Sequence, residues 1–348
     1  MNFRIFAGAL ALTLAACSGT EEEKKDPLEG VEITGELNIY SSRHYDTDLA
    51  LYTDFTKATG IKVNRLEAGA DALIERIESE GEYSLADLLI TVDAGRLWRA
   101  EEAGILSPVE SDVLTERLPE NLRHPDGLWF GVSTRARIII YNKEAGAPEG
   151  LATYADLADP SLKGEICMRS SSNIYNISLL SSIIANKDAA AAESWAKGVV
   201  ANFKRDPQGN DTANIEAVAS GECGVSVVNT YYLARYANDP EKADLLDKIG
   251  IIFPNQETTG THINLSGVGV VKTAPNRENA IRFIEYLTEE AAQKYFANGN
   301  SEYPAVKGVE AASAVEALGT FKSDTLNAAK LGINQRAAVE IFDRAGWN

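Results

Sequence analysis

Hydrophobic and polar residues alternate in two rhythms over the first hundred positions, one typical of strands and the other of helices. Short apolar segments predict three strands, at residues 36–41, 61–66 and 86–92. Apolar side chains at helical spacing predict three helices, at residues 46–58, 70–80 and 96–103. A glycine, which typically ends a helix, closely follows each of them, at positions 60, 81 and 104. This alternating order indicates a parallel sheet with helices on both faces.

Two longer extended stretches then change the pattern. Residues 129–141 and 263–271 have no helical pattern beside them, and a second α/β set lies between them. Its strands are expected at residues 164–169 and 224–228, and its helices at residues 175–185, 190–202, 211–220 and 230–238. Further helical patterns fill residues 277–298 and 309–345. Two α/β lobes joined by two extended crossings would form a hinge with a cleft between the lobes.

The chain is long enough for this arrangement. Its 348 residues can form two domains of ordinary size, and an apolar fraction of 45% suits a packed core. Taking the extended stretches as the crossings, we expect lobe 1 to comprise residues 35–134 and 263–308. Lobe 2 would comprise residues 135–262 and 309–348.

The N-terminal segment is typical of an exported protein. Residues 1–16 place Arg4 ahead of an apolar run, which indicates a secretory signal peptide. The run ends in a Leu-Ala-Ala-Cys sequence that looks like a bacterial lipobox, so Cys17 is expected to become the lipidated first residue. The alternative is an ordinary cleavage site with a chance cysteine. Residues 17–34 are highly charged and without apolar periodicity, as in a flexible tether.

Charge and motifs exclude several classes of function. Lys and Arg number 33 against 51 Asp and Glu, a net charge of −18, which argues against nucleic acid and against a polybasic membrane patch. The chain has no GxSxG, HExxH, phosphate-loop or GxGxxG motif in the required context. Its three histidines are scattered, so no local motif supports catalysis, although a triad assembled in space stays open. We therefore expect a binding protein rather than an enzyme.

Two cysteines remain once Cys17 is set aside. Cys167 and Cys223 form an even pair in an exported chain, which favours a disulfide. Two buried free thiols are the alternative. The chain has no CxxC or Cys/His metal spacing, so a zinc site is disfavoured.

The most informative positions are polar rings that follow predicted strands. In open α/β sheets, ligands bind outside the carboxyl ends of the strands. His44 and Tyr45 come just after the strand at 36–41, and Tyr175 comes just after the strand at 164–169. The adjacent pair Tyr231 and Tyr232 follows the strand at 224–228. Ordinary packing of tyrosines at helix starts is the alternative interpretation.

Tyrosine clusters have a specific metal preference. A phenol loses its proton only near pH 10, and a small trivalent cation displaces that proton best. Softer divalent ions favour thiolates or imidazoles, and calcium favours clustered carboxylates. Four tyrosines with one histidine therefore indicate ferric iron. Four phenolates around Fe³⁺ would leave a charge of −1, which Arg135 or Arg235 could balance; for each arginine, an ordinary surface ion pair is the alternative.

At these residues the chain resembles the periplasmic ferric-iron-binding proteins of bacterial ABC importers, especially a tyrosine-rich group known from cyanobacteria. The matching stretches are YSSRHYDTD at 40–48, ADLLITVDAGRLWRA at 86–100, GVSTRARIIIYNK at 131–143, RSSSNIYN at 169–176, VVNTYYLARY at 227–236 and NSEYPAV at 300–306. They span nearly all of the chain after the signal segment. RHYDTD and NTYYLARY are the most specific of them.

The resemblance implies a two-lobed, type II periplasmic-binding-protein fold that closes like a Venus flytrap and has no catalytic role. It implies a set of iron ligands comprising His44, Tyr45, Tyr175, Tyr231 and Tyr232. It also implies that Arg135 and Arg235 balance the charge behind these ligands. Val92 stands where other ferric-binding proteins carry a carboxylate, which leaves Tyr175 to complete the site.

The resemblance further implies a transport role. The protein would be a periplasmic monomer, membrane-anchored through its lipid, that hands Fe³⁺ to an ABC transporter permease and its ATPase; Fe²⁺ stays open as a second cargo. Alternatives are the same fold binding thiamine, a polyamine or an oxyanion, or a surface lipoprotein with an adhesion or assembly role. A polyamine site would need several carboxylates, and an oxyanion site would rely on backbone N–H groups and arginine.

Overall fold

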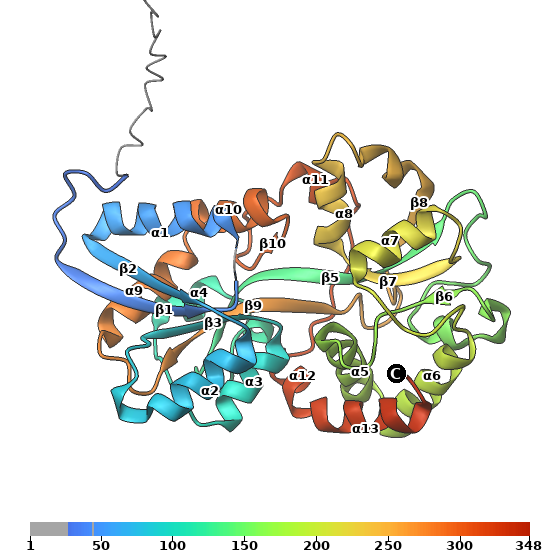
Figure 1. Ribbon diagram of the computed structural model, residues 1–348, viewed down its shortest axis with the longest axis horizontal. Coiled ribbons are helices and arrows are strands. Elements are labelled where there is room, and N and C mark those ends of the chain that lie inside the picture. The colour runs from blue at the N-terminus through green and yellow to red at the C-terminus, as the bar shows by residue number, and fades with distance from the viewer. Residues whose placement is uncertain (1–26, 44) are drawn as a thin grey trace, which may run out of the picture.

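The computed structural model describes residues 27–43 and 45–348. The predicted signal peptide, the lipidation site Cys17 and the first part of the predicted tether lie outside the described residues, as does His44. The body contains ten strands and thirteen α-helices within these ranges. Figure 1 shows two lobes side by side, with two long strands running between them.

The first hundred residues fold much as their pattern predicts. Three strands form here, namely β1 (Gly35–Ser41), β2 (Ile61–Glu67) and β3 (Leu88–Val92). The helices that follow them are α1 (Asp46–Thr59), α2 (Ala70–Glu80) and α3 (Ala94–Glu102). Strand β1 pairs in parallel with both β2 and β3, as the alternating order requires. Helix α1 ends at Gly60, whose positive φ of 72° is readily adopted by glycine.

Next come β4 (Leu106–Ser107), α4 (Asp112–Arg117) and the long strand β5 (Phe130–Asn142). The second α/β set has the strands β6 (Ile166–Cys167), β7 (Val225–Asn229) and β8 (Ile249–Ile252). Its helices are α5 (Ile174–Asn186), α6 (Ala189–Ala201), α7 (Asp211–Ala219) and α8 (Thr230–Ala237). The last part contains β9 (Ile263–Val271), α9 (Arg277–Leu287), α10 (Glu290–Asn300), β10 (Tyr303–Pro304), α11 (Ser313–Glu316), α12 (Ala329–Ile333) and α13 (Gln335–Ala345).

One sheet connects both lobes, because β5 changes partners along its length. The order of strands is β2-β1-β3-β9-β5-β7-β6. The first half of β5, up to Ala136, pairs antiparallel with β9, whereas Arg137 to Asn142 pair with β7 and β8. The two expected crossings are therefore β5 and β9, which confirms the two-lobed class with two extended crossings (Figure 1).

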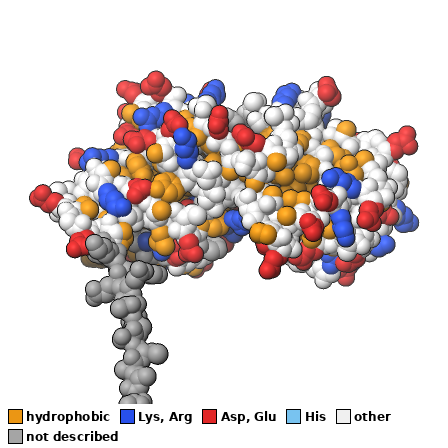
Figure 2. Space-filling model, turned by 90° about the horizontal axis from the view of Figure 1, so that it is seen from above, with side chains coloured by type: hydrophobic (Ala, Val, Ile, Leu, Met, Phe, Trp, Pro, Cys, Tyr) orange, Lys and Arg blue, Asp and Glu red, His pale blue; other side chains and the backbone are white. Residues whose placement is uncertain are grey.

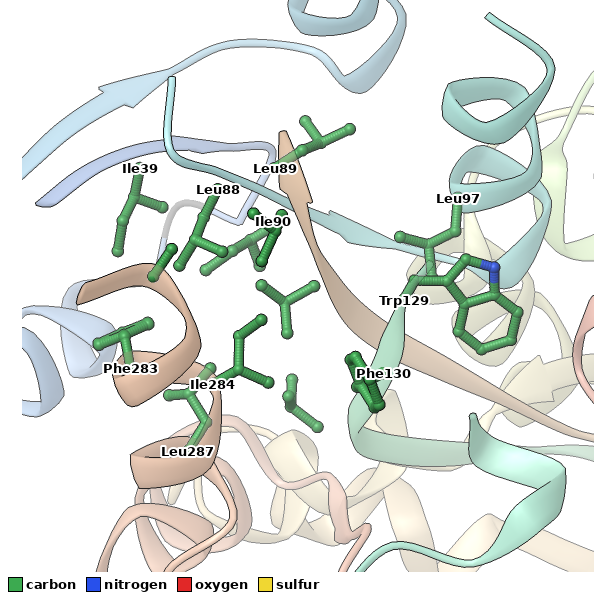
Figure 3. Close-up of a cluster of buried hydrophobic side chains, with 14 of the residues drawn as sticks. Ile39, Leu88, Leu89, Ile90, Leu97, Trp129, Phe130, Phe283, Ile284 and Leu287 are labelled. Atoms are coloured by element: carbon green, nitrogen blue, oxygen red, sulfur yellow. The ribbon is translucent and has the colours of Figure 1, made fainter. Parts of the chain in front are cut away.

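Each lobe is built around its own hydrophobic core. We call the first lobe the body around the core whose buried residues lie within 37–132, 265–305 and 328–331. Figure 3 shows part of this core, where side chains of β1, β3, β5 and α9 such as Ile39, Ile90, Phe130 and Phe283 meet. The second lobe is the body around two further cores, whose residues lie within 136–249 and 338–347. The limits predicted for the lobes from the sequence stay a prediction.

Three segments depart from the sequence-based expectation. The strand expected at 164–169 is only the two residues of β6, because Met168 already bonds to the loop residue Gln208. The helix expected at 277–298 is broken into α9 and α10, and Gln293 bonds to the carbonyl of Leu287 at the break. The helical region expected at 309–345 is interrupted, because Lys322 and Asp324 bond to the backbone of Thr261 instead. In all three, tertiary hydrogen bonds outweigh local propensity.

The surface agrees with the acidic composition. Figure 2 shows acidic side chains spread over both lobes and interspersed with basic ones, with a narrow waist between the lobes. Within residues 27–43 and 45–348, no helix is both long and apolar enough to cross a membrane.

The expected disulfide is present. Cys167 of β6 is bonded to Cys223 just before β7, and their Cα atoms are 5.9 Å apart. Since β6 and β7 are parallel neighbours, the bond links the end of β6, which leads toward Tyr175, to the segment just before β7, which leads to Tyr231. It closes a loop between positions 56 apart in sequence.

We predict that the double variant Cys167→Ala/Cys223→Ala loses up to about 4 kcal/mol of unfolding free energy, the chain-entropy value for a loop of this length. Urea denaturation with and without dithiothreitol measures it. Reductant should lower the unfolding free energy of the wild type to near that of the variant, and it should leave the unfolding free energy of the variant unchanged. Equal stability of the two oxidised proteins would contradict a stabilising role for the bond.

Candidate metal centre

The four described candidate tyrosines all lie where a strand gives way to a helix. Tyr45 immediately precedes α1 and has extended backbone. Tyr175 is the second residue of α5, whose first turn is capped by the Asn173 side chain at 3.2 Å from the Tyr175 nitrogen. Tyr231 and Tyr232 lie in the first turn of α8, directly after β7. These are the carboxyl-end positions at which open α/β sheets bind ligands.

These four tyrosines line one cleft of about 550 Å³. Its other lining residues are Ser41, Ser42, Glu67, Ala68, Gly69, Ala70, Val92, Arg96 and Arg235. Tyr45 comes from the first lobe, and the other three tyrosines come from elements of the second lobe. The fold thus brings together side chains that are up to 187 positions apart in sequence, from Tyr45 to Tyr232.

The phenol oxygens of the second lobe are close together. Tyr231 Oη lies 3.2 Å from Tyr175 Oη, and Asn229 Nδ2 lies 3.4 Å from Tyr231 Oη. The rings of Tyr231 and Tyr232 lie 4.4 Å apart at an angle of 31°, so the adjacent side chains point in similar directions. Two oxygens bound to one small cation at about 2 Å, at right or tetrahedral angles, are themselves about 3 Å apart. The spacing of Tyr175 and Tyr231 therefore suits two ligands of one ion.

Burial makes Tyr175 and Tyr231 harder to ionise than a free phenol while no cation is bound. Tyr231 is only 4% exposed, and burial followed by the neighbouring Tyr175 and Tyr232 raises its pKa well above the usual value near 10. Burial and then Tyr232 also raise the pKa of Tyr175, although the hydrogen bond with Tyr231 acts in the opposite direction. A cation that binds here must displace phenolic protons, so its binding releases them.

Two arginines lie over the tyrosine rings, and one of them, Arg235, also lines the cleft. The Arg235 guanidinium carbon is 5.2 Å from the ring centre of Tyr45 and 5.0 Å from that of Tyr231. Arg43, which the sequence analysis did not single out, lies 4.9 Å from the ring centre of Tyr45 on its other flank. The two guanidinium groups thus place positive charge against the rings of Tyr45 and Tyr231.

Arg135 stands behind the cleft in a buried ion network. Its Nη2 lies 2.7 Å from Glu302 Oε1, and Arg43 Nη1 lies 3.0 Å from Glu302 Oε2. Ser133 and Ser266 complete the network with hydrogen bonds to Glu302 or to the arginines. Two further nitrogens of Arg135, Nε and Nη1, have no hydrogen-bond partner among the described residues although they are buried. The guanidinium thus keeps unused donors and charge close to the tyrosines, whose charge acts on its pKa.

A second buried carboxylate organises the other side of the site. Asp211 is fully buried and accepts hydrogen bonds from Arg137 at 2.7 Å, Arg169 at 3.1 Å and the backbone nitrogen of Asn229 at 2.9 Å. Both arginines also lie over the ring of Tyr175, at 5.7 and 5.3 Å from its centre. Asp211 therefore ties the position of Tyr175 to the strand end that carries Tyr231.

The structure adds two charged residues that the sequence analysis missed. Glu67 and Arg96 both line the cleft. Glu67 ends β2, so the same rule of strand ends that selected the tyrosines would have found it. Arg96 lies in the first turn of α3, where no motif indicates it. Val92, expected at the position of a carboxylate in other ferric-binding proteins, lines the cleft as well.

Other donor sets for a metal do not form in the described part of the chain. Within residues 27–43 and 45–348, no three His, Cys, Asp or Glu side chains come together as a group that could hold a metal ion. A thiolate, imidazole or carboxylate cage is therefore absent from these residues. The four phenols, with the single carboxylate of Glu67, are the anionic oxygen donors among the described residues that line the cleft.

Comparison with known proteins identifies the family. The family model described as bacterial extracellular solute-binding protein matches residues 50–325, which is most of the chain. The chain belongs to this family. The match includes both crossing strands and the helices that carry Tyr175, Tyr231 and Tyr232.

Individual relatives of this solute-binding protein are closely similar. Iron uptake protein A1 of Synechocystis is 54% identical over 90% of this chain and 87% of its own length. A Trichodesmium protein, solved in complex with iron and citrate ligands, is 55% identical with a TM-score of 0.88 and covers 90% of this chain and 100% of its own. The ferric binding protein from Campylobacter jejuni is 42% identical, with a TM-score of 0.84 over 90% and 100% of the two chains.

These comparisons confirm the type II periplasmic-binding fold that the resemblance implied. They also bear out the expectation of a binding protein, because the family consists of solute-binding proteins rather than enzymes. The comparisons do not identify individual iron ligands, so the ligand set is argued from the geometry of the cleft.

The Glu302 network yields a stability prediction for this solute-binding protein. Burial alone would raise the pKa of Glu302, but Arg43 and Arg135 lower it to about 2. Removing one partner of a buried ion network leaves uncompensated charge, so Glu302→Gln should cost about 3 kcal/mol of unfolding free energy at neutral pH. Urea denaturation measures the loss, with the exposed Glu257→Gln as the matched control.

The loss should depend on pH in a defined direction. The pKa of Glu302 in the folded protein lies below its ordinary value of 4.5. Its contribution to the free energy of unfolding is therefore fully present above about pH 4.5. It is lost as the pH falls through this window toward 2, so wild type and variant should converge there. A difference that stayed constant from pH 6 down to pH 2.5 would show that the carboxylate charge does not stabilise the fold.

Proposed function

We propose that this solute-binding protein captures ferric iron in the tyrosine-lined cleft and delivers it to the permease of an ABC importer. The observation that carries the proposal is the convergence of Tyr45, Tyr175, Tyr231 and Tyr232 on one cleft. Phenolates are hard, anionic oxygen donors, and a small trivalent cation is the ion best able to displace their protons. The names of the relatives, which include an iron uptake protein and a ferric binding protein, support the same cargo.

The proposed ligands are these four tyrosines together with His44. Four phenolates around Fe³⁺ carry a net charge of −1. Arg235 over the rings and Arg135 behind them supply the compensating charge. The two buried arginine–carboxylate networks then hold the tyrosines and arginines in place before iron arrives, so little ordering is needed on binding.

The cleft argues against the other solutes considered. A polyamine site needs several carboxylates, whereas Glu67 is the only acid among the described residues that line the cleft. An oxyanion site would use arginine and backbone N–H groups, and it would not explain a phenol–phenol contact of 3.2 Å. A role as an adhesion lipoprotein would not need a cleft of this composition at all.

Cellular placement follows from the family and the N-terminal sequence. An extracytoplasmic solute-binding protein works outside the inner membrane, here in the periplasm. We propose that it is anchored there as a lipoprotein through Cys17, that residues 17–34 act as the tether, and that it is a monomer. Its partners are then the permease and ATPase of the importer.

Substitution of single phenols tests the ligand set. Tyr231→Phe removes one ligand and should weaken ferric binding more than about 100-fold, since changes behind a ligand alone cost 10- to 100-fold. Iron–phenolate charge transfer absorbs visible light, so the variant should also lose or shift its colour. Ferric citrate titration followed by absorbance measures both.

Tyr236→Phe is the matched control, because Tyr236 lies on the same helix but donates its hydroxyl hydrogen bond to Glu216, away from the cleft. It should bind iron like the wild type. If Tyr231→Phe and Tyr232→Phe both bound ferric iron with wild-type affinity and colour, the proposed function would be wrong.

Iron should also close the lobes. Tyr45 belongs to the first lobe and the other three tyrosines to the second, so an ion bound by both sides interacts more strongly with the closed state. Small-angle X-ray scattering of the iron-free and iron-loaded protein should show a smaller radius of gyration with iron. Identical scattering profiles would contradict closure of the lobes. They would not affect the result of the tyrosine substitutions, which test the ligand set separately.

A further inference from the structure

A second cavity, partly open to solvent, lies in the second lobe, away from the tyrosine cleft. It has a volume of about 290 Å³ and lies between the end of α5, the start of α6 and the loop before β9. Its walls are formed by Tyr154, Ala155, Ser182, Ile183, Asn186, Lys187, Ala191, Trp195, Asn255, Thr258, Thr259, Gly260, His262, Asp324 and Thr153. None of these residues lines the tyrosine cleft. We call it the His262 cavity.

Most polar groups around the His262 cavity are already satisfied by the protein. Trp195 Nε1 donates to the carbonyl of Tyr154 at 2.6 Å, which leaves its indole ring as an apolar wall. Asn186 Nδ2 donates to Asp324 Oδ2 at 2.6 Å. Asn255 bonds to the backbone nitrogen of Tyr154 at 3.1 Å. These groups therefore form the walls of the cavity, and their hydrogen bonds are already made within the protein.

The imidazole of His262 is the exception. The residue is 4% exposed and lines the cavity, and among the described residues its only hydrogen bonds are made by its backbone, not by its ring nitrogens. Burial, with the Arg137 guanidinium nearby, lowers the pKa of His262 to about 3, so the ring is neutral at physiological pH. A neutral imidazole has one donor and one acceptor nitrogen. The ring nitrogens of His262 are not among the fully buried unpaired polar atoms, so they are accessible from the cavity and can bond to a ligand there.

Charge and size narrow the class of ligand. Asp324 in the wall disfavours anions, whereas Lys187 at the rim and Arg137 behind His262 disfavour cations. The volume lies at the low end of the range of about 300–1,000 Å³ for small-molecule pockets, so a compound of one or two rings fits. A hydroxyl group can donate to or accept from imidazole, and so pairs with either tautomer.

We propose that the His262 cavity is a second small-molecule site, which binds a neutral ring compound through one hydroxyl group bonded to the imidazole of His262. The site is independent of iron binding. Tyr175 lies near the start of α5 and Asn186 at its end, so the two sites are about 16 Å apart along that helix. His262 immediately precedes β9, one of the two crossing strands, and its backbone nitrogen donates to Tyr154 Oη at 3.2 Å.

The experiment uses 4-bromophenol as the probe and bromobenzene as its partner without the hydroxyl. Both are titrated into the iron-free protein, with two-dimensional NMR for affinity and bromine anomalous scattering from soaked crystals for position. We expect 4-bromophenol to bind in the cavity, with roughly 2- to 10-fold higher affinity than bromobenzene, the value of one hydrogen bond. His262→Phe keeps a ring of similar size and should erase this difference between the probes.

A substitution at the edge of the cavity tests the proposal even if His262→Phe does not fold. Ala191 is exposed on α6 and lines the cavity, so Ala191→Leu should fill its mouth and abolish binding of both probes. Ala190→Leu makes the same change at the neighbouring exposed position outside the cavity, and should bind like the wild type. The proposal is overturned if 4-bromophenol fails to bind, if its bromine lies elsewhere, if the hydroxyl gives no advantage, or if Ala191→Leu binds both probes normally. Ferric binding of Ala191→Leu should be unchanged, which separates this outcome from a failure of the iron proposal.

Discussion

The antiparallel pairing of β5 with β9 is the constraint on which the rest of this molecule depends. These two strands carry the chain between the two hydrophobic cores, so their register sets which residues of one lobe face the other. Arg135 and Arg137 are two positions apart on β5 and share a face of the strand. One bonds to Glu302 near the first lobe, and the other to Asp211 in the second. A single strand thus supplies the anchor of both buried ion networks behind the tyrosine cleft.

Those networks resolve an electrostatic problem that the cleft creates. Four phenols gathered in a half-buried place repel one another once ionised, and burial already raises the pKa of Tyr175 and Tyr231. Arginines close to the rings offset this, but a buried arginine is itself costly unless it is paired. Glu302 and Asp211 provide the pairing from the side away from the ligand. Once the four phenols are ionised, a trivalent cation therefore supplies most of the positive charge that balances them, and the nearby arginines supply the rest.

The tyrosine cleft and the His262 cavity differ in the chemistry of their walls. The tyrosine cleft opens between the lobes and is lined by phenols and charged groups that suit a hard cation. The His262 cavity lies within the second lobe, has mostly apolar walls, and offers a single neutral imidazole. Helix α5 contributes its first turn to one and its last turn to the other. The same helix therefore borders both sites, although the sites share no lining residue.

Much of this could be derived from the sequence, because hydrophobic period and strand ends are local properties. The period predicted the α/β order and both crossings, and the rule of strand ends selected Tyr45, Tyr175 and the Tyr231–Tyr232 pair. Local pattern could not show that 309–345 is interrupted, because the bonds of Lys322 and Asp324 go to Thr261, more than sixty positions away. Nor could it reveal Glu302 as the partner of Arg43 and Arg135, or His262 as an unpaired buried ring. Ion pairing and burial depend on which distant segments meet in space, and only the tertiary structure decides that.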